Sequence, residues 1–133
     1  MNLLEVSNIC KTYGNGEAAV QALKSVSFSV PKGEYVAIVG ESGSGKSTLL
    51  NMIGALDMPD SGKVMIGGRD IFSMNDHKLT IFRRRNIGFI FQAFNLIPEL
   101  TVEQNIIFSV LLDYQKPDMK YLEELLVVLN LKE

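Results

Sequence analysis

The segment from Gly40 to Thr48 combines residue types that bind phosphate. It reads Gly-Glu-Ser-Gly-Ser-Gly-Lys-Ser-Thr and matches the pattern G-x-x-x-x-G-K-[ST]. Glycine lets the backbone curl with its N–H groups pointing inward, because a Cβ would obstruct the approach of an anion. A helix that starts near Gly45 would aim its positive end at the same anion. The residues expected to bind a nucleotide here are Gly40, Ser42, Gly43, Ser44, Gly45, Lys46, Ser47 and Thr48.

Two side chains of this segment carry the expected chemistry. The Lys46 ammonium supplies a point charge for the β- and γ-phosphates of ATP, and the Ser47 hydroxyl is placed to ligate Mg²⁺. A chance match in a glycine-rich turn is the alternative. The context argues against chance, since an apolar run at residues 35–39 leads into Gly40 and an amphipathic helix is predicted directly after the loop.

Hydrophobic periodicity predicts the elements that position this loop. Alternation predicts strands over residues 3–13 and 21–30, and a small hairpin over 63–71. The uninterrupted apolar runs at 35–39 and 87–91 predict buried strands of a parallel sheet. Helical patterns cover residues 46–54, 75–85, a stretch from Thr101 that opens with a capping box, and 119–131.

Composition excludes several classes of protein. The 133 residues carry a net charge of −2 and 47% hydrophobic residues, typical of a globular chain with no electrostatic reason to bind nucleic acid. The arginines at 83–85 are expected to be a solvated helix face that complements the helix end. Cys10 is the only cysteine, which excludes a disulfide framework and fits a reducing, cytosolic setting. No signal peptide or membrane-spanning run is predicted.

Two residues outside the phosphate loop narrow the function. Tyr13 ends the strand before a glycine turn, and Gln92 ends the run at 87–91. With these residues and the segments 13–23, 40–51 and 87–98, the whole chain resembles ATP-binding subunits of ABC transporters. It is most similar to the branch that serves lipoprotein release, macrolide export and peptide-antibiotic resistance.

The resemblance implies roles for particular residues. Tyr13 would stack on the adenine, and Gln92 would reach Mg²⁺ and the attacking water, as in the Q-loop of the family. Lys46 and Gln92 are therefore the expected catalytic residues, and Ser47 and Gln92 the expected Mg²⁺ ligands. Residues 93–100 would lie near the surface that docks the membrane subunit.

The resemblance also implies a fold and a division of the chain. The expected fold is α/β, a P-loop NTPase (RecA-like) core with an N-terminal antiparallel β subdomain and the beginning of a helical subdomain, so an incomplete domain. Residues 1–34 and 62–72 would form the antiparallel part, and 35–61 with 73–92 the core. Residues 93–133 would hold the Q-loop and the start of the helical subdomain.

Three elements of the family are not found in the 133 residues: the LSGGQ-type signature, the strand ending in the catalytic glutamate, and the switch histidine. The run at 110–113 imitates the second of these, but Tyr114 follows it in place of glutamate. We therefore expect the chain alone to hydrolyse ATP negligibly, since general-base assistance contributes about 10²–10⁴-fold. We also expect it to be poorly stable alone, because strands would be missing between 35–39 and 87–91.

The resemblance implies partners for the full-length protein. Two copies would sandwich two ATP molecules and drive a transmembrane permease subunit from the cytoplasmic face of the membrane. A soluble ABC ATPase of the DNA-repair type and a non-catalytic nucleotide-binding module remain alternatives. The residues do not encode the transported substrate or the direction of transport, but the branch that the chain resembles mostly exports substrates or extracts them from membranes, which implies export or extraction here.

Overall fold

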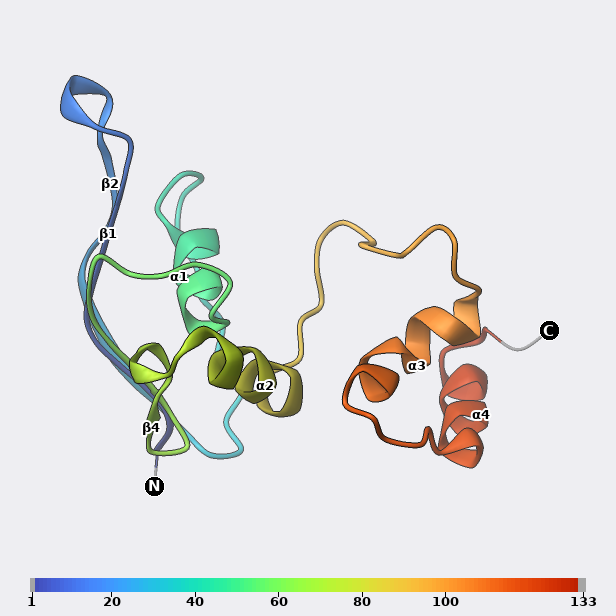
Figure 1. Ribbon diagram of the computed structural model, residues 1–133. Coiled ribbons are helices and arrows are strands. Elements are labelled where there is room, and N and C mark those ends of the chain that lie inside the picture. Colours follow the sequence, from blue (N-terminus) through green and yellow to red (C-terminus); the bar gives the residue numbers. More distant parts are fainter. Residues whose placement is uncertain (1, 132–133) are drawn as a thin grey trace. The chain divides into compact units, whose positions relative to one another are not determined.

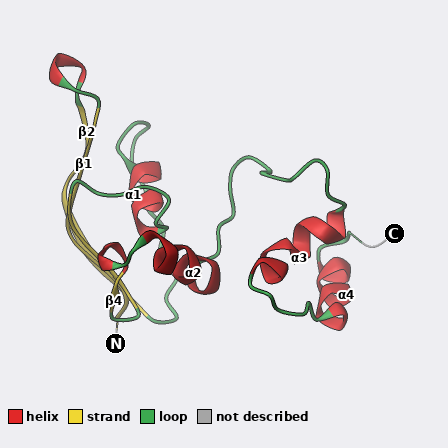
Figure 2. Ribbon diagram, viewed as in Figure 1, coloured by secondary structure: helices red, strands yellow, loops and turns green. Residues whose placement is uncertain are grey.

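The computed structural model describes residues 2–131, and the chain divides into two compact units between Phe89 and Ile90. The first unit holds an antiparallel sheet with the helices α1 and α2, and the second holds the helices α3 and α4 (Figures 1 and 2).

The sheet of the first unit is built around the long strand β1 (Asn2–Tyr13). The strand β2 (Val20–Pro31) pairs with one edge of β1, and β3 (Ser61–Ile66) pairs with the other. The two-residue strand β4 (Arg69–Asp70) completes the order β2-β1-β3-β4, with every pairing antiparallel. The strands predicted from alternation at 3–13 and 21–30, and the hairpin at 63–71, are therefore confirmed.

A bulge in β1 explains why its apolar residues break strict alternation. The pairing with β2 shifts register between Val6 and Ile9, and Asn8 between them has a positive φ of 50°. The extra residue changes the phase of the strand, so that Val6 and Ile9 both face the core at 2% and 0% exposure. The bulge is held by the Asn8 amide, which donates to Ser27 Oγ at 2.8 Å.

Two helices pack on this sheet. The helix α1 (Lys46–Ile53) contributes Leu49 and Met52 to the core, and α2 (Asp76–Asn86) contributes Phe82. Figure 1 shows both helices on the same side of the strands. The sheet contributes Val6 and Ile9 from β1, Leu23 from β2 and Val64 from β3 to the same core. Ala55, which follows α1, and Ile71, which follows β4, complete it.

One of the three arginines that end α2 does not belong to a solvated face as predicted. Arg83 Nη1 donates to the carbonyl oxygen of Ala55 at 2.9 Å, and the residue is half-buried. This bond ties α2 to the turn that follows α1. Arg83 therefore joins two elements of the first unit, while its position in the last turn also complements the negative end of the helix.

The buried parallel strands predicted at residues 35–39 and 87–91 are wrong for the described structure. Neither run belongs to the sheet, and Tyr35 and Val39 are 96% and 85% exposed. A strand forms only when it pairs with another strand, and neither run is paired with a strand within residues 2–131. The second run is anchored by Phe89, whose ring occupies the space where a side chain on Gly54 would point.

The second unit consists of α3 (Val102–Leu112) and α4 (Met119–Val128). The predicted capping box is confirmed, because Thr101 Oγ1 accepts from the Gln104 amide at 3.2 Å and Gln104 Oε1 accepts from the Thr101 amide at 2.9 Å. The side chain of Asp118 caps α4 by accepting from two backbone amides of its first turn. The predicted helix at 119–131 is confirmed with an earlier end, at Val128.

Candidate nucleotide-binding site

The segment predicted to bind phosphate is a curled loop that leads directly into α1. Gly43 and Gly45 have φ values of 77° and 92°, a region that side chains disfavour. The Ser44 amide closes a turn on the Glu41 carbonyl at 3.3 Å, and α1 begins at Lys46. The loop therefore sits at the N-terminal end of the helix, where unpaired amides and the helix dipole favour an anion.

The Lys46 side chain folds back over this loop. Its Nζ donates to the carbonyl oxygens of Gly40 at 2.8 Å and Glu41 at 2.5 Å, and lies 3.3 Å from Ser44 Oγ. The ammonium is thus held at the loop by two backbone carbonyls. An ammonium at this position is chemically suited to a charge-assisted hydrogen bond with a phosphate oxygen.

A hollow of about 360 Å³ lies beside the loop and α1. Its lining includes Lys46, Ser47 and Thr48 from the start of α1 and the β2 residues Val20, Gln21 and Ala22, together with loop residues Ser42, Gly43 and Gly45. The Lys46 ammonium and the Ser47 hydroxyl in this lining, at the N-terminal end of α1, are groups suited to a phosphate and its Mg²⁺. A Cβ added to Gly40 would stand 2.9 Å from Ser44 Oγ and 4.0 Å from the Lys46 side chain.

The loop is fixed to the sheet at Gly45. A Cβ on Gly45 would overlap the carbonyl oxygen of Ala22 and lie 3.3 Å from Leu23 Cδ2. The backbone of β2 therefore passes directly against the loop. Glycine at this position is required by its positive φ and by the close approach of the strand together.

Tyr13 lies next to the same hollow. Its register partner across the sheet is Val20, which lines the hollow. The phenol donates to Asp57 Oδ2 at 2.7 Å, and the ring remains 41% exposed. The hydrogen bond to Asp57 raises the pKa of the Tyr13 phenol above its ordinary 10.0, while the Thr48 side chain and Lys11 act in the opposite direction. Tyr13 and the start of α1 are therefore neighbours.

Sequence reasoning missed the two side chains that hold Tyr13. Asp57 lies outside every element that the sequence predicts, and Lys11 lies within the predicted strand at 3–13. In the structure Lys11 Nζ lies 5.2 Å from the centroid of the Tyr13 ring and 3.3 Å from Asp57 Oδ1. The hydrogen bond from Tyr13 and those from Met58 and Lys11 lower the pKa of the Asp57 carboxyl. No local pattern links residues so far apart in the chain.

Gln92 is in the second unit, whereas the phosphate loop is in the first. Gln92 is exposed, and it precedes an apolar groove of about 490 Å³ within that unit. Asn105 fixes the wall of the groove, since its side chain accepts from the Ile97 amide at 2.9 Å and donates to the carbonyls of Ile97, Leu100 and Thr101. The groove overlaps the segment 93–100 that the sequence singles out for docking.

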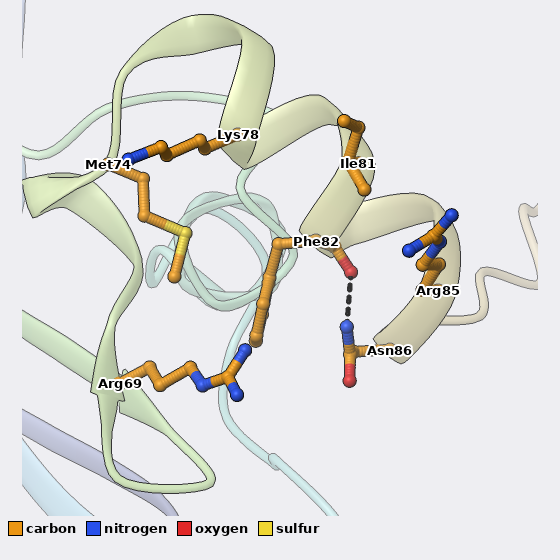
Figure 3. A pocket seen from close by; sticks show the side chains of 7 residues that line it. All are labelled: Arg69, Met74, Lys78, Ile81, Phe82, Arg85 and Asn86. Carbon is orange, nitrogen blue, oxygen red and sulfur yellow. Dashed lines mark hydrogen bonds between the residues drawn. The ribbon is translucent and has the colours of Figure 1, made fainter.

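A second hollow of the first unit, about 300 Å³, lies between β4 and α2 (Figure 3). Arg69, Lys78 and Arg85 contribute basic side chains around Met74, Ile81 and Phe82, and Asn86 Nδ2 donates to the Phe82 carbonyl at 2.8 Å. None of the residues predicted to bind nucleotide lines this hollow.

Residues 2–131 lack two features that mark other kinds of site. That part of the chain holds no group of three or more His, Cys, Asp or Glu side chains arranged to hold a metal ion. It also holds no helix with both the length and the apolar character needed to cross a bilayer.

The loop, the helix it caps and the adjoining sheet have the arrangement of a P-loop nucleotide-binding domain. Residues 23–133 match the family model described as ABC transporter, so the chain belongs to the ABC transporter family.

Named relatives agree with this family. The chain is 47% identical over 118 residues to the ABC transporter ATP-binding protein YxdL of Bacillus subtilis, covering 89% of this chain and 46% of that protein. It is 47% identical over 111 residues to the lipoprotein-releasing system ATP-binding protein LolD of Geobacter metallireducens, covering 84% and 49%. The chain thus spans about half the length of the curated relatives it matches.

A solved structure shares the fold. The ATP-binding cassette MJ0796 of Methanocaldococcus jannaschii, in a dimeric post-hydrolysis state bound to ADP and Pi, superposes with a TM-score of 0.79. The two chains are 45% identical over 86% of this chain and 49% of that one. The antiparallel sheet with helices is therefore part of an ABC ATPase cassette, as the sequence interpretation holds.

Proposed function

We propose that this chain binds MgATP through the loop at 40–48, with Tyr13 against the adenine. The observation that carries the proposal is the position of Lys46, whose ammonium is held over the loop at the N-terminal end of α1. A triphosphate there would meet the lysine, the loop amides and the helix dipole together. Ser47, the next residue of α1, would offer its hydroxyl to Mg²⁺.

The full-length protein is proposed to work as a dimer that hydrolyses ATP and drives a transmembrane permease subunit. Support comes from the family and from MJ0796, whose cassette is described as dimeric and bound to ADP and Pi. The names of the relatives favour a transporter over a DNA-repair ATPase. Export or extraction from the membrane, at its cytoplasmic face, is the direction we propose.

Gln92 is proposed to complete the site in the full-length protein. Its amide would contact Mg²⁺ and the attacking water, which joins the nucleotide to the segment 93–100 and its apolar groove. Residues 1–133 carry Lys46 and Gln92, with no catalytic glutamate or signature loop identified among them, so we propose that this stretch alone is inactive.

The test is MgATP binding by the full-length protein, measured by calorimetry. We expect Lys46→Ala to weaken binding about 10- to 100-fold, because the variant loses charge-assisted hydrogen bonds to phosphate. Lys32→Ala, in the exposed turn after β2, is the matched control and should bind as the parent does. Equal affinities for parent and Lys46→Ala would refute the assignment of the loop.

A further inference from the structure

Three side chains at the end of β1 and after α1 form one connected cluster. The Tyr13 phenol and the Lys11 ammonium both bond to the Asp57 carboxylate, at 2.7 Å and 3.3 Å. Lys11 Nζ also donates to the Met58 carbonyl at 2.6 Å. Each Asp57 oxygen therefore has its own partner, and the carboxylate joins a strand residue to the loop that follows α1.

The loop that carries Asp57 is itself fixed at both of its ends. Near α1, the amides of Leu56 and Asp57 donate to the Asn51 carbonyl at 2.8 Å and 3.4 Å. Near β1, Asp60 Oδ2 accepts from the Thr12 amide at 2.6 Å, and the Asp60 amide donates to the Cys10 carbonyl at 2.9 Å. Asp57 is therefore held on a rigid segment, which lets its carboxylate fix the Tyr13 ring in turn.

The cluster leaves one face of the Tyr13 ring for a ligand. The Lys11 ammonium lies over the ring, 5.2 Å from its centroid, and so covers one face. Tyr13 as a residue is nonetheless 41% exposed, and its strand partner Val20 lines the hollow beside the phosphate loop. An open aromatic face at this place fits a flat base whose phosphates reach the loop.

We propose that Asp57 is a positioning residue for the nucleotide base, which fixes the Tyr13 ring so that its open face meets the base while Lys11 covers the other. The inference rests on the proposed nucleotide binding and deepens it. An unanchored tyrosine at a strand end rotates about its side-chain bonds, and binding would then require ordering the ring. The hydrogen bond to the Asp57 carboxylate orders the Tyr13 ring before the nucleotide binds.

The test compares two probes on the full-length protein: MgATP, which has a base, and inorganic tripolyphosphate with Mg²⁺, which has none. For Asp57→Ala we expect MgATP affinity to fall about three- to tenfold, the effect of losing one partly exposed charge-assisted hydrogen bond. Tripolyphosphate affinity should stay within about twofold, because the phosphate loop makes no bond to Asp57.

Two further variants separate positioning from simple disruption. Glu34→Ala removes an exposed carboxylate from the turn after β2, which takes no part in the cluster, so its MgATP affinity should match the parent. Tyr13→Phe keeps the ring and removes the phenol. Its effect and that of Asp57→Ala should not add in the double variant, since both break the same hydrogen bond.

Three results would overturn the positioning role of Asp57, and only the last would also overturn nucleotide binding. Loss of MgATP and tripolyphosphate affinity to the same degree in Asp57→Ala would show a general collapse of the loop and overturn the positioning role. Unchanged affinity for both probes in Asp57→Ala would also overturn it, while nucleotide binding itself stands. Failure of the parent protein to bind MgATP would overturn the proposed function and this inference with it.

Discussion

Replacing Gly45 by alanine should destabilise the protein more than the same change two residues earlier. Two costs apply at Gly45. Its φ of 92° carries a penalty of about 1–2 kcal/mol for a residue with a Cβ. The new Cβ would also overlap the Ala22 carbonyl, and forcing a methyl group into packed structure costs about 1–3 kcal/mol more.

Gly43→Ala is the matched control. Gly43 has a similar φ of 77°, but nothing stands within 4 Å of the position that its Cβ would take. Only the conformational penalty applies there, about 1–2 kcal/mol. We therefore expect Gly45→Ala to lower the free energy of unfolding by about 2–5 kcal/mol in total, and Gly43→Ala by the smaller amount.

The assay is urea unfolding of the full-length protein without nucleotide, so that changes in ligand affinity do not enter the result. Far-UV circular dichroism reports the transition. If Gly45→Ala proved no more destabilising than Gly43→Ala, the close approach of β2 to the loop would be refuted, and with it the account of how the sheet fixes the phosphate loop.

Two other predictions concern hydrogen bonds that the sequence does not reveal. The Tyr13–Asp57 bond should stabilise the fold fully between about pH 5 and 9. This stabilisation is lost as pH falls through the pKa of the Asp57 carboxyl, which is lowered below 3.8. It is also lost as pH rises through the pKa of the Tyr13 phenol, which is raised above 10.0. Unfolding free energies of the parent and of Tyr13→Phe, compared across pH, measure the contribution. Asn105→Ala should cost about 1–3 kcal/mol, because it leaves the Ile97 amide without its 2.9 Å acceptor. Hydrogen exchange should accelerate at Ile97, whereas the exposed Ser109→Ala on the same helix should change neither quantity.

Local interactions explain what the sequence predicted well. The phosphate loop follows from glycine spacing, and the helix after it begins at Lys46 as its pattern indicates. The capping box at Thr101 and Gln104 depends on residues three apart, so the sequence specifies it almost completely. Such features need no knowledge of distant parts of the chain.

The errors arise where a segment depends on a distant partner. The apolar runs at 35–39 and 87–91 have the composition of buried strands, but composition supplies no hydrogen-bonded neighbour. Arg83 shows the same effect in a side chain. It resembles a solvated helix end in the sequence, yet it bonds to a carbonyl of the turn after α1.

By itself, the sequence determined the phosphate loop, the helices and long strands around it, and the resemblance to ABC ATP-binding subunits. Only the tertiary structure decided what holds Tyr13, how closely β2 passes Gly45, and which apolar runs join the sheet. The physical reason is the separation of the interacting residues along the sequence. Turns, caps and helices form among residues close in sequence, whereas strand pairing and side-chain anchoring join residues that meet only when the chain folds.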